Sequence, residues 1–310
     1  NRKIAIGTKE TLIENEKEGM AKMNCNFLRL GEPQEMGKEK DKIIGLLKLS
    51  KDKFVTFLKN GSMNVWNLGS IHCNNCIQIS ADKNTNIESI VYCKIDDSLI
   101  AVAHQNNIEL YDLTTSSRIA TLSAHMDKIT SLIHVTSGIL VSASLDKTMK
   151  IWDASTTTLL GQFEESTGVV HSIARLSPKI IISGEGNRIV LWDISTKAVI
   201  CEFEREGKSE DAYADQILVI SNHSFLVKYH NDTKIDYFEM KDNKFIKKNN
   251  YYSLTNQPVQ IEYINSAFTL GVCNNSLVYL NKTDPEISSS TFTNLLNEAY
   301  QAVCYLNDTT

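Results

Sequence analysis

Short runs of apolar residues, each about four to seven residues long, alternate with polar turns along most of the chain. Runs of this length that are rich in Val, Ile, Leu and Phe predict β-strands, and helical spacing of apolar residues is nearly absent. The clearest stretch predicts four strands at Ile129–Val135, Ile139–Ser144, Thr148–Asp153 and Leu159–Phe163. The continuous apolar residues of the second strand suit a sheet that is covered on both faces. The pattern therefore predicts an all-β protein made of four-stranded sheets.

Six aromatic residues recur at intervals of 40 to 45 residues, and four of them are followed by Asp or Asn. They are Trp66, Tyr111, Trp152, Trp192, Tyr237 and Tyr279. A repeat of this length with an aromatic residue before Asp is typical of one blade of a β-propeller. A propeller buries its core between blades and presents loops on its faces, so the repeat favours a docking function.

We expect one propeller domain over residues 1–310, with seven blades. Six blades follow the aromatic repeat, and their expected bounds are 43–80, 87–122, 128–163, 169–204, 215–249 and 258–292. The closing blade combines residues 299–310 with residues 1–30, because the two ends placed tail to head imitate Leu132–Ser142. Pairing the ends in one sheet would remove exposed strand edges. The alternative is a six-bladed ring with trailing ends.

The third repeat contains Ala124-His125, then Ser-Ala-Ser-Leu-Asp146, then Lys150-Ile-Trp-Asp153. In these residues the chain resembles the WD40-repeat propeller family, and the resemblance covers nearly its whole length, most strongly residues 87–204. It implies a structural, hydrogen-bonded tetrad of His125, Asp146, Trp152 and either Ser142 or Ser144. The set is chemically consistent, because an indole N–H donates, a carboxylate accepts, and imidazole and hydroxyl groups do both.

The other repeats depart from the family pattern. The fourth keeps Ser183 and Trp192-Asp193, but it has Gly186-Asn187 at the turn and no His near Ser166. The first, second, fifth and sixth lack the tetrad. The chain is thus interpreted as a divergent WD40-like propeller.

Composition narrows the possible partners and locations. The chain has 42% apolar and 22% charged residues and a net charge of −5. Its Lys residues alternate with Asp and Glu rather than gathering in one patch, so we expect no nucleic-acid partner. Its apolar runs are too short to cross a membrane, and no signal peptide opens the chain. The seven scattered Cys favour a reducing compartment, so we expect an intracellular, cytoplasmic protein.

One motif resembles a metal or redox site. His72, Cys73 and Cys76 could begin a zinc site, but a fourth ligand and a second pair are missing from the sequence pattern. In the blade scheme these residues form the turn before a fourth strand, and that interpretation is favoured over a metal or a disulfide. Gly-rich phosphate loops and a nucleophile elbow are also missing. We therefore expect no cofactor, no metal and no catalytic residues.

The leading hypothesis for function is a non-catalytic docking scaffold that binds one or more proteins or peptides. Within each blade we name the four strands a to d in chain order. The turns from b to c and from d to the next a share one face, called the loop face here, and WD40-like proteins commonly bind there. The contact candidates on this face are His104, Arg188, Tyr213, His230, Tyr251 and Tyr252.

Two alternatives stay open. The chain begins at Asn1, which favours a regulatory sensor domain within a larger protein, bound to other domains of the same chain. The second alternative is an enzyme with its active site in the central channel. That alternative needs acid–base groups or metal ligands at matching positions on several blades, and the sequence shows none.

Overall fold

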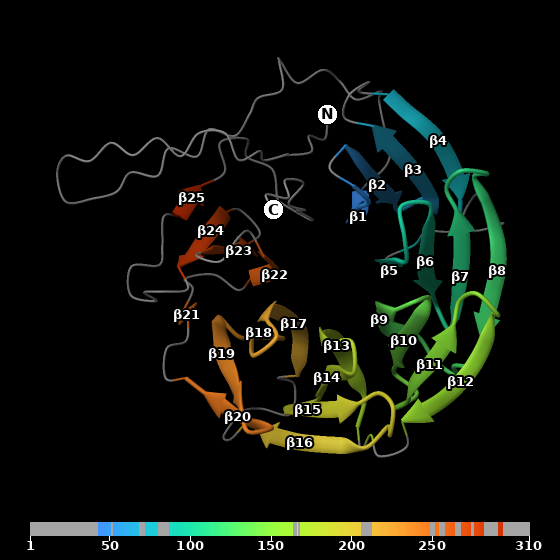
Figure 1. Ribbon diagram of the computed structural model, residues 1–310. Helices are drawn as coiled ribbons and strands as arrows, with labels where there is room; N and C mark the ends of the chain where they lie inside the picture. Colours follow the sequence, from blue (N-terminus) through green and yellow to red (C-terminus); the bar gives the residue numbers. More distant parts are fainter. Residues whose placement is uncertain are drawn as a thin grey trace.

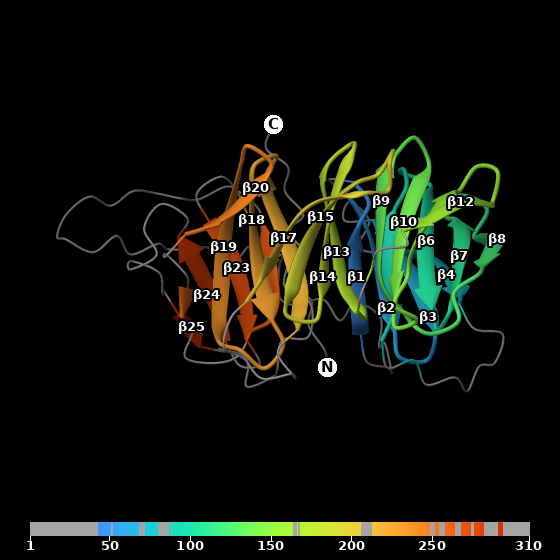
Figure 2. The same ribbon diagram turned by 90° about the horizontal axis from the view of Figure 1, so that it is seen from below.

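Six antiparallel sheets follow one another around a ring in the computed structural model (Figure 1). The structure describes residues 43–293, except 51, 68–71, 80–86, 88, 164–165, 167, 206–212, 249–251, 254–257, 264–267, 274–275 and 282–290. Seen edge-on, the strands run between the two faces of the ring (Figure 2). The expected closing blade, from residues 299–310 and 1–30, lies outside the described residues.

Each sheet is built from consecutive strands and forms one blade. Blade one contains β1 (Ile43–Lys48), β2 (Lys53–Leu58), β3 (Ser62–Asn67) and β4 (His72–Gln78). Blade two contains β5 (Val91–Lys94), β6 (Leu99–His104), β7 (Asn107–Asp112) and β8 (Ser117–Ser123). Blade three contains β9 (Ile129–Thr136), β10 (Ile139–Ser144), β11 (Met149–Asp153) and β12 (Thr158–Phe163).

Blades four to six continue the same order. Blade four contains β13 (Val170–Ser177), β14 (Ile180–Glu185), β15 (Arg188–Asp193) and β16 (Val199–Glu204). Blade five contains β17 (Ala214–Ser221), β18 (Ser224–Tyr229), β19 (Lys234–Lys241) and β20 (Lys244–Lys247), and β21 (Tyr252–Ser253) also pairs with β19. Blade six contains β22 (Pro258–Tyr263), β23 (Phe268–Cys273), β24 (Ser276–Asn281) and β25 (Thr291–Thr293).

The strands predicted for blade three agree with the observed ones to within one residue at each end. One placement in blade one was wrong. The segment His72–Gln78 is itself the fourth strand, paired with β3, rather than the turn that precedes that strand. β4 is the outermost strand of its sheet and pairs along one edge only. Such an edge strand can form with few apolar residues.

Strand registers show which positions are equivalent from blade to blade. Opposite the second residue of strand b lie Trp66, Tyr111, Trp152, Trp192 and Phe238 in blades one to five. The sequence repeat placed Tyr237 there, and this was wrong by one residue. Phe238 is fully buried, whereas Tyr237 is only partly buried. Because strand side chains alternate between faces, a shift of one residue selects the wrong face. In blade six the same register position is Leu280 rather than Tyr279.

The hydrophobic core lies between adjacent blades. The indole of Trp192 in blade four meets Phe163 of blade three edge-on, with ring centroids 5.3 Å apart. Phe238 in blade five meets Phe203 of blade four in the same way, at 5.0 Å. Each pair joins an outer-strand Phe to the equivalent aromatic residue of the next blade, and such edge-to-face contacts add to the stabilisation from burial.

Hydrogen bonds also join the innermost strands of neighbouring blades. The Tyr92 hydroxyl accepts from the Leu46 N–H at 2.9 Å and donates to the Leu46 carbonyl at 3.1 Å. The Gln216 amide exchanges two bonds of 2.8 Å with the Ile261 backbone. These side chains satisfy backbone groups that the neighbouring sheet leaves free, and they hold the wall of the central channel together.

Candidate functional site

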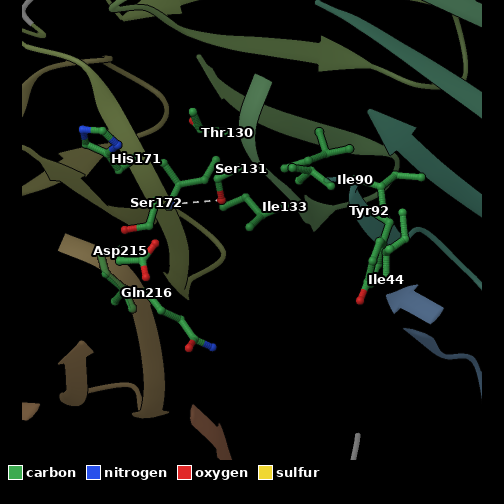
Figure 3. A pocket seen from close by; sticks show the side chains of 14 residues that line it. Ile44, Ile90, Tyr92, Thr130, Ser131, Ile133, His171, Ser172, Asp215 and Gln216 are labelled. Carbon is green, nitrogen blue, oxygen red and sulfur yellow. Dashed lines mark hydrogen bonds between the residues drawn. The ribbon is translucent and has the colours of Figure 1, made fainter. Parts of the chain in front are cut away.

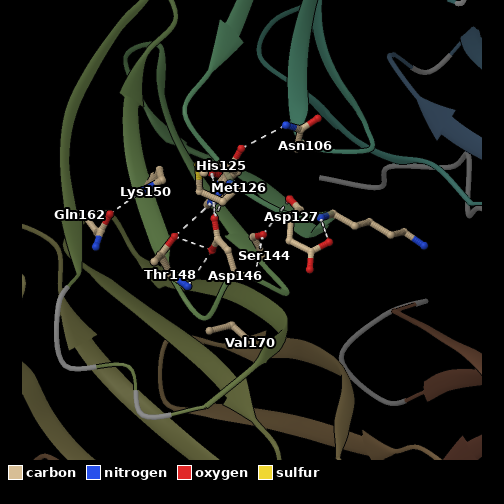
Figure 4. Close-up of polar contacts among 12 residues, drawn as sticks. Asn106, His125, Met126, Asp127, Ser144, Asp146, Thr148, Lys150, Gln162 and Val170 are labelled. Atoms are coloured by element: carbon tan, nitrogen blue, oxygen red, sulfur yellow. Dashed lines mark hydrogen bonds and ion pairs between the residues drawn. The ribbon is translucent and has the colours of Figure 1, made fainter.

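A buried series of hydrogen bonds ties the segment after blade two to blade three, and Figure 4 shows its loop-face end around His125, Asp146 and Thr148. Trp152 Nε1 donates to Ser142 Oγ at 2.8 Å, and Ser142 Oγ lies 2.7 Å from His125 Nε2. His125 Nδ1 lies 2.7 Å from Asp146 Oδ2. Because the indole can only donate, the Ser142 hydroxyl accepts from Trp152 and donates a hydrogen bond to His125 Nε2. His125 in turn donates from Nδ1 to the Asp146 carboxylate.

Only one of the two candidate serines, Ser142, takes part in this series of hydrogen bonds. Ser144 Oγ donates to the Asp127 carbonyl at 3.0 Å and accepts from the Asp146 N–H at 3.1 Å. Its role is therefore to shape the turn that carries Asp146. Sequence spacing could not separate Ser142 from Ser144, because both lie on the same face of β10.

The Asp146 carboxylate is the most heavily bonded member of the tetrad. It also accepts from Thr148 Oγ1 at 2.6 Å and from the Met126 N–H at 2.9 Å. Burial alone would raise the pKa of Asp146, but these bonds and His125 hold it at about 2. Burial lowers the pKa of His125 despite the adjacent carboxylate. The tetrad therefore fixes two loop segments around a neutral imidazole and an ionised carboxylate.

The loop that ends at the tetrad presents an apolar side chain to solvent. Met126 follows His125, and its side chain is 87% exposed while its N–H is bound to Asp146. The tetrad thus holds the Met126 backbone through its N–H, while the Met126 side chain extends into solvent.

Other blades keep parts of this arrangement. In blade four, Trp192 Nε1 donates to Ser183 Oγ at 2.8 Å, and Ser183 donates to the buried Glu185 carboxylate at 2.8 Å. In blade one, Trp66 Nε1 donates to Thr56 Oγ1 at 2.9 Å. An indole and a hydroxyl thus pair in three blades, and among the described residues blade three alone adds His and Asp to this pair.

Blade five makes the equivalent loop contact with an ion pair that the sequence analysis missed. Arg205 follows β16 as His125 follows β8, and its guanidinium lies 2.9 Å from the Asp232 carboxylate in the turn between strands b and c. A second nitrogen lies 3.3 Å from Asp236, and the guanidinium stacks 3.9 Å over the Tyr229 ring. The repeat could have indicated this residue, because Arg205 lies two repeat lengths after His125 in the sequence.

Two predicted contact residues meet at the loop face. The rings of Tyr213 and His230 stack with centroids 4.6 Å apart and an interplanar angle of 6°. On its other side Tyr213 stacks on His171 at 3.7 Å and 18°. His171 was not among the predicted contact residues, because nothing local in the sequence shows that the start of β13 reaches the segment before β17. We call these three residues the ring stack.

The polar edges of the ring stack are left without partners in the described part of the chain. There the Tyr213 hydroxyl and the ring nitrogens of His171 and His230 make no hydrogen bond. Burial and the nearby Asp215 carboxylate raise the pKa of Tyr213. Burial lowers the pKa of His171. Tyr213 and His171 are therefore neutral near neutral pH, and the three rings are held by stacking.

The ring stack borders an open pocket along the central channel (Figure 3). Its wall comes from the innermost strands of blades one to five, including Tyr92, Ser131, His171, Asp215 and Gln216. Asp215 is the one carboxylate in this lining, and one of its oxygens accepts from the buried Lys228 ammonium. A catalytic centre would need several acid–base groups here, and the described lining has a single carboxylate beside a single imidazole.

The remaining candidates are dispersed. His104 ends β6 in another blade, where burial lowers its pKa. Arg188 is engaged in an ion pair with Glu202 on the outer strand. Tyr251 and the side chain of Tyr252 lie outside the described residues, as do the side chains of His72 and Cys73.

The described residues give no support to the metal motif. Cys76 is an exposed free thiol. Across the part of the chain that the structure describes, His, Cys, Asp and Glu side chains form no group of three that could hold a metal ion. Within the same residues no helix is long and apolar enough to cross a membrane.

Comparison with known proteins adds to these observations. Residues 125–174 match the family model of the TEP-1 C-terminal β-propeller. Over 116 residues the chain is 36% identical to the WD repeat-containing protein 89 homolog of Dictyostelium discoideum. This alignment covers 36% of this chain and 31% of that protein. Over 199 residues it is 25% identical to the sterol regulatory element-binding protein cleavage-activating protein of Xenopus laevis. This alignment covers 63% of this chain and 15% of that protein.

Solved structures share the fold at low sequence identity. The WD40 repeats of RRP9 have a TM-score of 0.66 at 11% identity and cover 84% of this chain and 83% of that chain. U3-55K has a TM-score of 0.64 at 12% identity and covers 79% of each chain. The chain spans less than a third of the length of the two curated relatives described above.

A ring of antiparallel sheets, tied at the loop face by buried polar chains, defines a β-propeller. The blade-three tetrad and the similarities to WD-repeat proteins show that the chain resembles the WD40-repeat family of β-propellers. Propellers of this family typically serve as interaction scaffolds and are usually non-catalytic.

Proposed function

We propose that this propeller is a non-catalytic docking domain that binds a protein or peptide at the loop face, around the ring stack. The observation that carries the proposal is the stack itself: three rings from two blades at the mouth of the channel, whose polar edges bond to none of the residues that the structure describes. Aromatic groups on a rigid scaffold lose little conformational entropy on binding, and they dominate many interfaces.

The supports of the loop face favour the same function. His125 with Asp146, and Arg205 with Asp232, each tie a segment that enters a blade to the turn between strands b and c. Both ties lie at the face that carries the ring stack. A surface that is held in advance binds without the cost of ordering its loops.

Affinity capture from a native lysate tests this proposal. The bait is the full chain as wild type, Tyr213→Ala, His230→Ala and the control His223→Ala. His223 and His230 flank the same strand, β18, at opposite ends, so the two variants make the same chemical change on opposite faces. We expect a partner that is lost with Tyr213→Ala and His230→Ala and retained with His223→Ala. Equal capture by all four baits would contradict docking at the ring stack.

We further propose that the ring closes with a seventh blade from residues 299–310 and 1–30. The support is the sequence pattern of the two ends and the stability gained when no blade edge is left unpaired. Deleting residues 1–30 should then remove three strands of a blade and lower the melting temperature sharply. An unchanged melting temperature would favour the six-bladed ring with trailing ends.

A further inference from the structure

We infer that the segment bound at the ring stack is basic, and that an arginine side chain of the partner seats between His171 and Asp215. The inference rests on the proposed docking function and specifies the chemistry of the partner. Two observations carry it: the ring at the end of the stack and the oriented carboxylate beside it.

The end of the stack offers a flat surface beside a carboxylate. His171 packs one ring face on Tyr213 and contributes to the pocket lining, where it lies near Asp215 (Figure 3). Asp215 Oδ2 accepts from the Lys228 ammonium, whose side chain is nearly buried. In the described part of the chain Asp215 Oδ1 makes no hydrogen bond. Lys228 thus orients the carboxylate, and one oxygen is left for a ligand.

Arginine fits this place better than lysine does. A guanidinium is flat, stacks on an aromatic face and donates several hydrogen bonds in a fixed plane, whereas an ammonium is a compact point charge. The protein already uses this geometry within blade five, where Arg205 lies over Tyr229 and contacts two carboxylates. His171 and Asp215 offer an incoming arginine the same pair of contacts, a ring face and a carboxylate oxygen.

The protonation of His171 gives the site a distinctive pH dependence. Burial and the neighbouring His230 lower the pKa of His171, while Asp215 raises it, and the net direction is downward. Among the described residues, the titratable groups around the ring are Asp215, Tyr213 and His230, and Lys228 pairs with Asp215. Near neutral pH the imidazole is neutral and accepts a cation on its face. In acid it becomes a cation and repels arginine.

Fluorescence anisotropy with labelled peptides tests the inference. The probes are a peptide of alternating arginine and glycine and its lysine and glutamate counterparts, each added to the full chain. We expect the arginine peptide to bind more tightly than the lysine peptide, and the glutamate peptide not to bind. His171→Ala should raise the Kd of the arginine peptide about tenfold, while His223→Ala leaves it unchanged. Binding should weaken with salt, and it should weaken as the pH falls below the range in which His171 is neutral.

A second variant covers the case in which His171→Ala unfolds the chain. Asp215→Asn removes the carboxylate charge without changing size, and it should also raise the Kd of the arginine peptide. The inference fails if the arginine and glutamate peptides bind alike, if neither variant changes the Kd, or if acid strengthens binding. Loss of a lysate partner with Tyr213→Ala, without any binding of the arginine peptide, would overturn this inference and leave the docking function standing.

Discussion

Blades three and five solve the same structural problem with different chemistry. Each ties the segment after the previous outer strand to a carboxylate in the turn between strands b and c. Blade three uses His125 and Asp146 at 2.7 Å, and blade five uses Arg205 and Asp232 at 2.9 Å. The loop contact persists while the residue types change. In both of these blades the acceptor is a carboxylate, and either an imidazole or a guanidinium can serve as its donor.

The surroundings of each tie follow from the donor. In blade three Ser142 relays between Trp152 and His125, whereas the equivalent position in blade five is Val227, because Phe238 has no N–H to satisfy. Blade five instead places Asp236 where blade three has Lys150, and this second carboxylate also faces Arg205. A buried guanidinium requires such matching, because an unpaired buried charge is costly.

The largest test of the comparison removes the blade-five cation. Arg205→Met keeps most of the apolar stem but leaves Asp232 without its ion pair, and the side chains involved are at most 10% exposed. We expect the free energy of unfolding to fall by about 3–5 kcal/mol, measured by urea denaturation. Arg118→Met is the control, because Arg118 is 55% exposed in its ion pair with Glu109, and the expected loss is below about 1 kcal/mol. Equal losses would show that burial of the ion pair does not set its value.

The second test removes the blade-three carboxylate. Asp146→Ala leaves His125 Nδ1, the Met126 N–H and Thr148 Oγ1 without their shared acceptor. We expect a loss of about 2–3 kcal/mol in the same denaturation experiment. Asp153→Ala, which removes an exposed turn carboxylate on the opposite face, should cost less. A larger loss for Asp153→Ala would contradict the role of the tetrad as the main support of this blade.

The difference between the blades also shows what sequence can predict. The strands of blade three were predicted to within a residue, because apolar runs and turn residues are local signals. The position of Phe238 was missed because a Tyr precedes it, and the repeat alone does not choose between neighbours. Arg205 and Asp232 were missed because nothing local links a residue after β16 to a turn beyond β18.

Two of the three residues of the ring stack were predicted, and the third was not, because contacts between blades are not local in the sequence. Tyr213 and His230 were selected as aromatic or imidazole residues in loops, but their meeting with His171 depends on how β13, β17 and β18 end side by side. Contacts between blades arise from closing the ring, and a single sequence holds no direct record of them.

The third test concerns the space at one equivalent position of strand b. It is Ala143 in blade three, Gly184 in blade four and Lys228 in blade five. A Cβ on Gly184 would come within 2.6 Å of Ala214 Cβ and 2.8 Å of the Ala214 carbonyl. Gly184→Ala should therefore cost about 1–3 kcal/mol through overpacking against blade five. Gly168→Ala, where a Cβ meets nothing within 4 Å, should change the unfolding midpoint little. Similar midpoints for both variants would mean that blades four and five can separate slightly without cost.

The smallest effect separates the two ties by their response to pH. Burial lowers the pKa of His125 in the folded protein below its usual 6.5, so the unfolded chain binds a proton first as the pH falls. Stability contributed by the neutral His125 is therefore present above pH 6.5 and is lost as the pH drops below it. Asp146 adds a further loss only in stronger acid, between its usual 3.8 and about 2. The ion pair of Arg205 with Asp232 and Asp236 contains no imidazole.

Unfolding free energies measured between pH 7 and 5 distinguish these behaviours. We expect wild type and Arg205→Met to share one slope, with stability falling toward acid, although their absolute stabilities differ. His125→Gln should have a shallower slope, because the lowered pKa of one buried imidazole no longer contributes. Other histidines with lowered pKa values, His104, His134 and His171, keep the slope from vanishing. If His125→Gln leaves the slope unchanged while Arg205→Met flattens it, the pH response belongs to blade five, and the contrast drawn between the two ties is reversed.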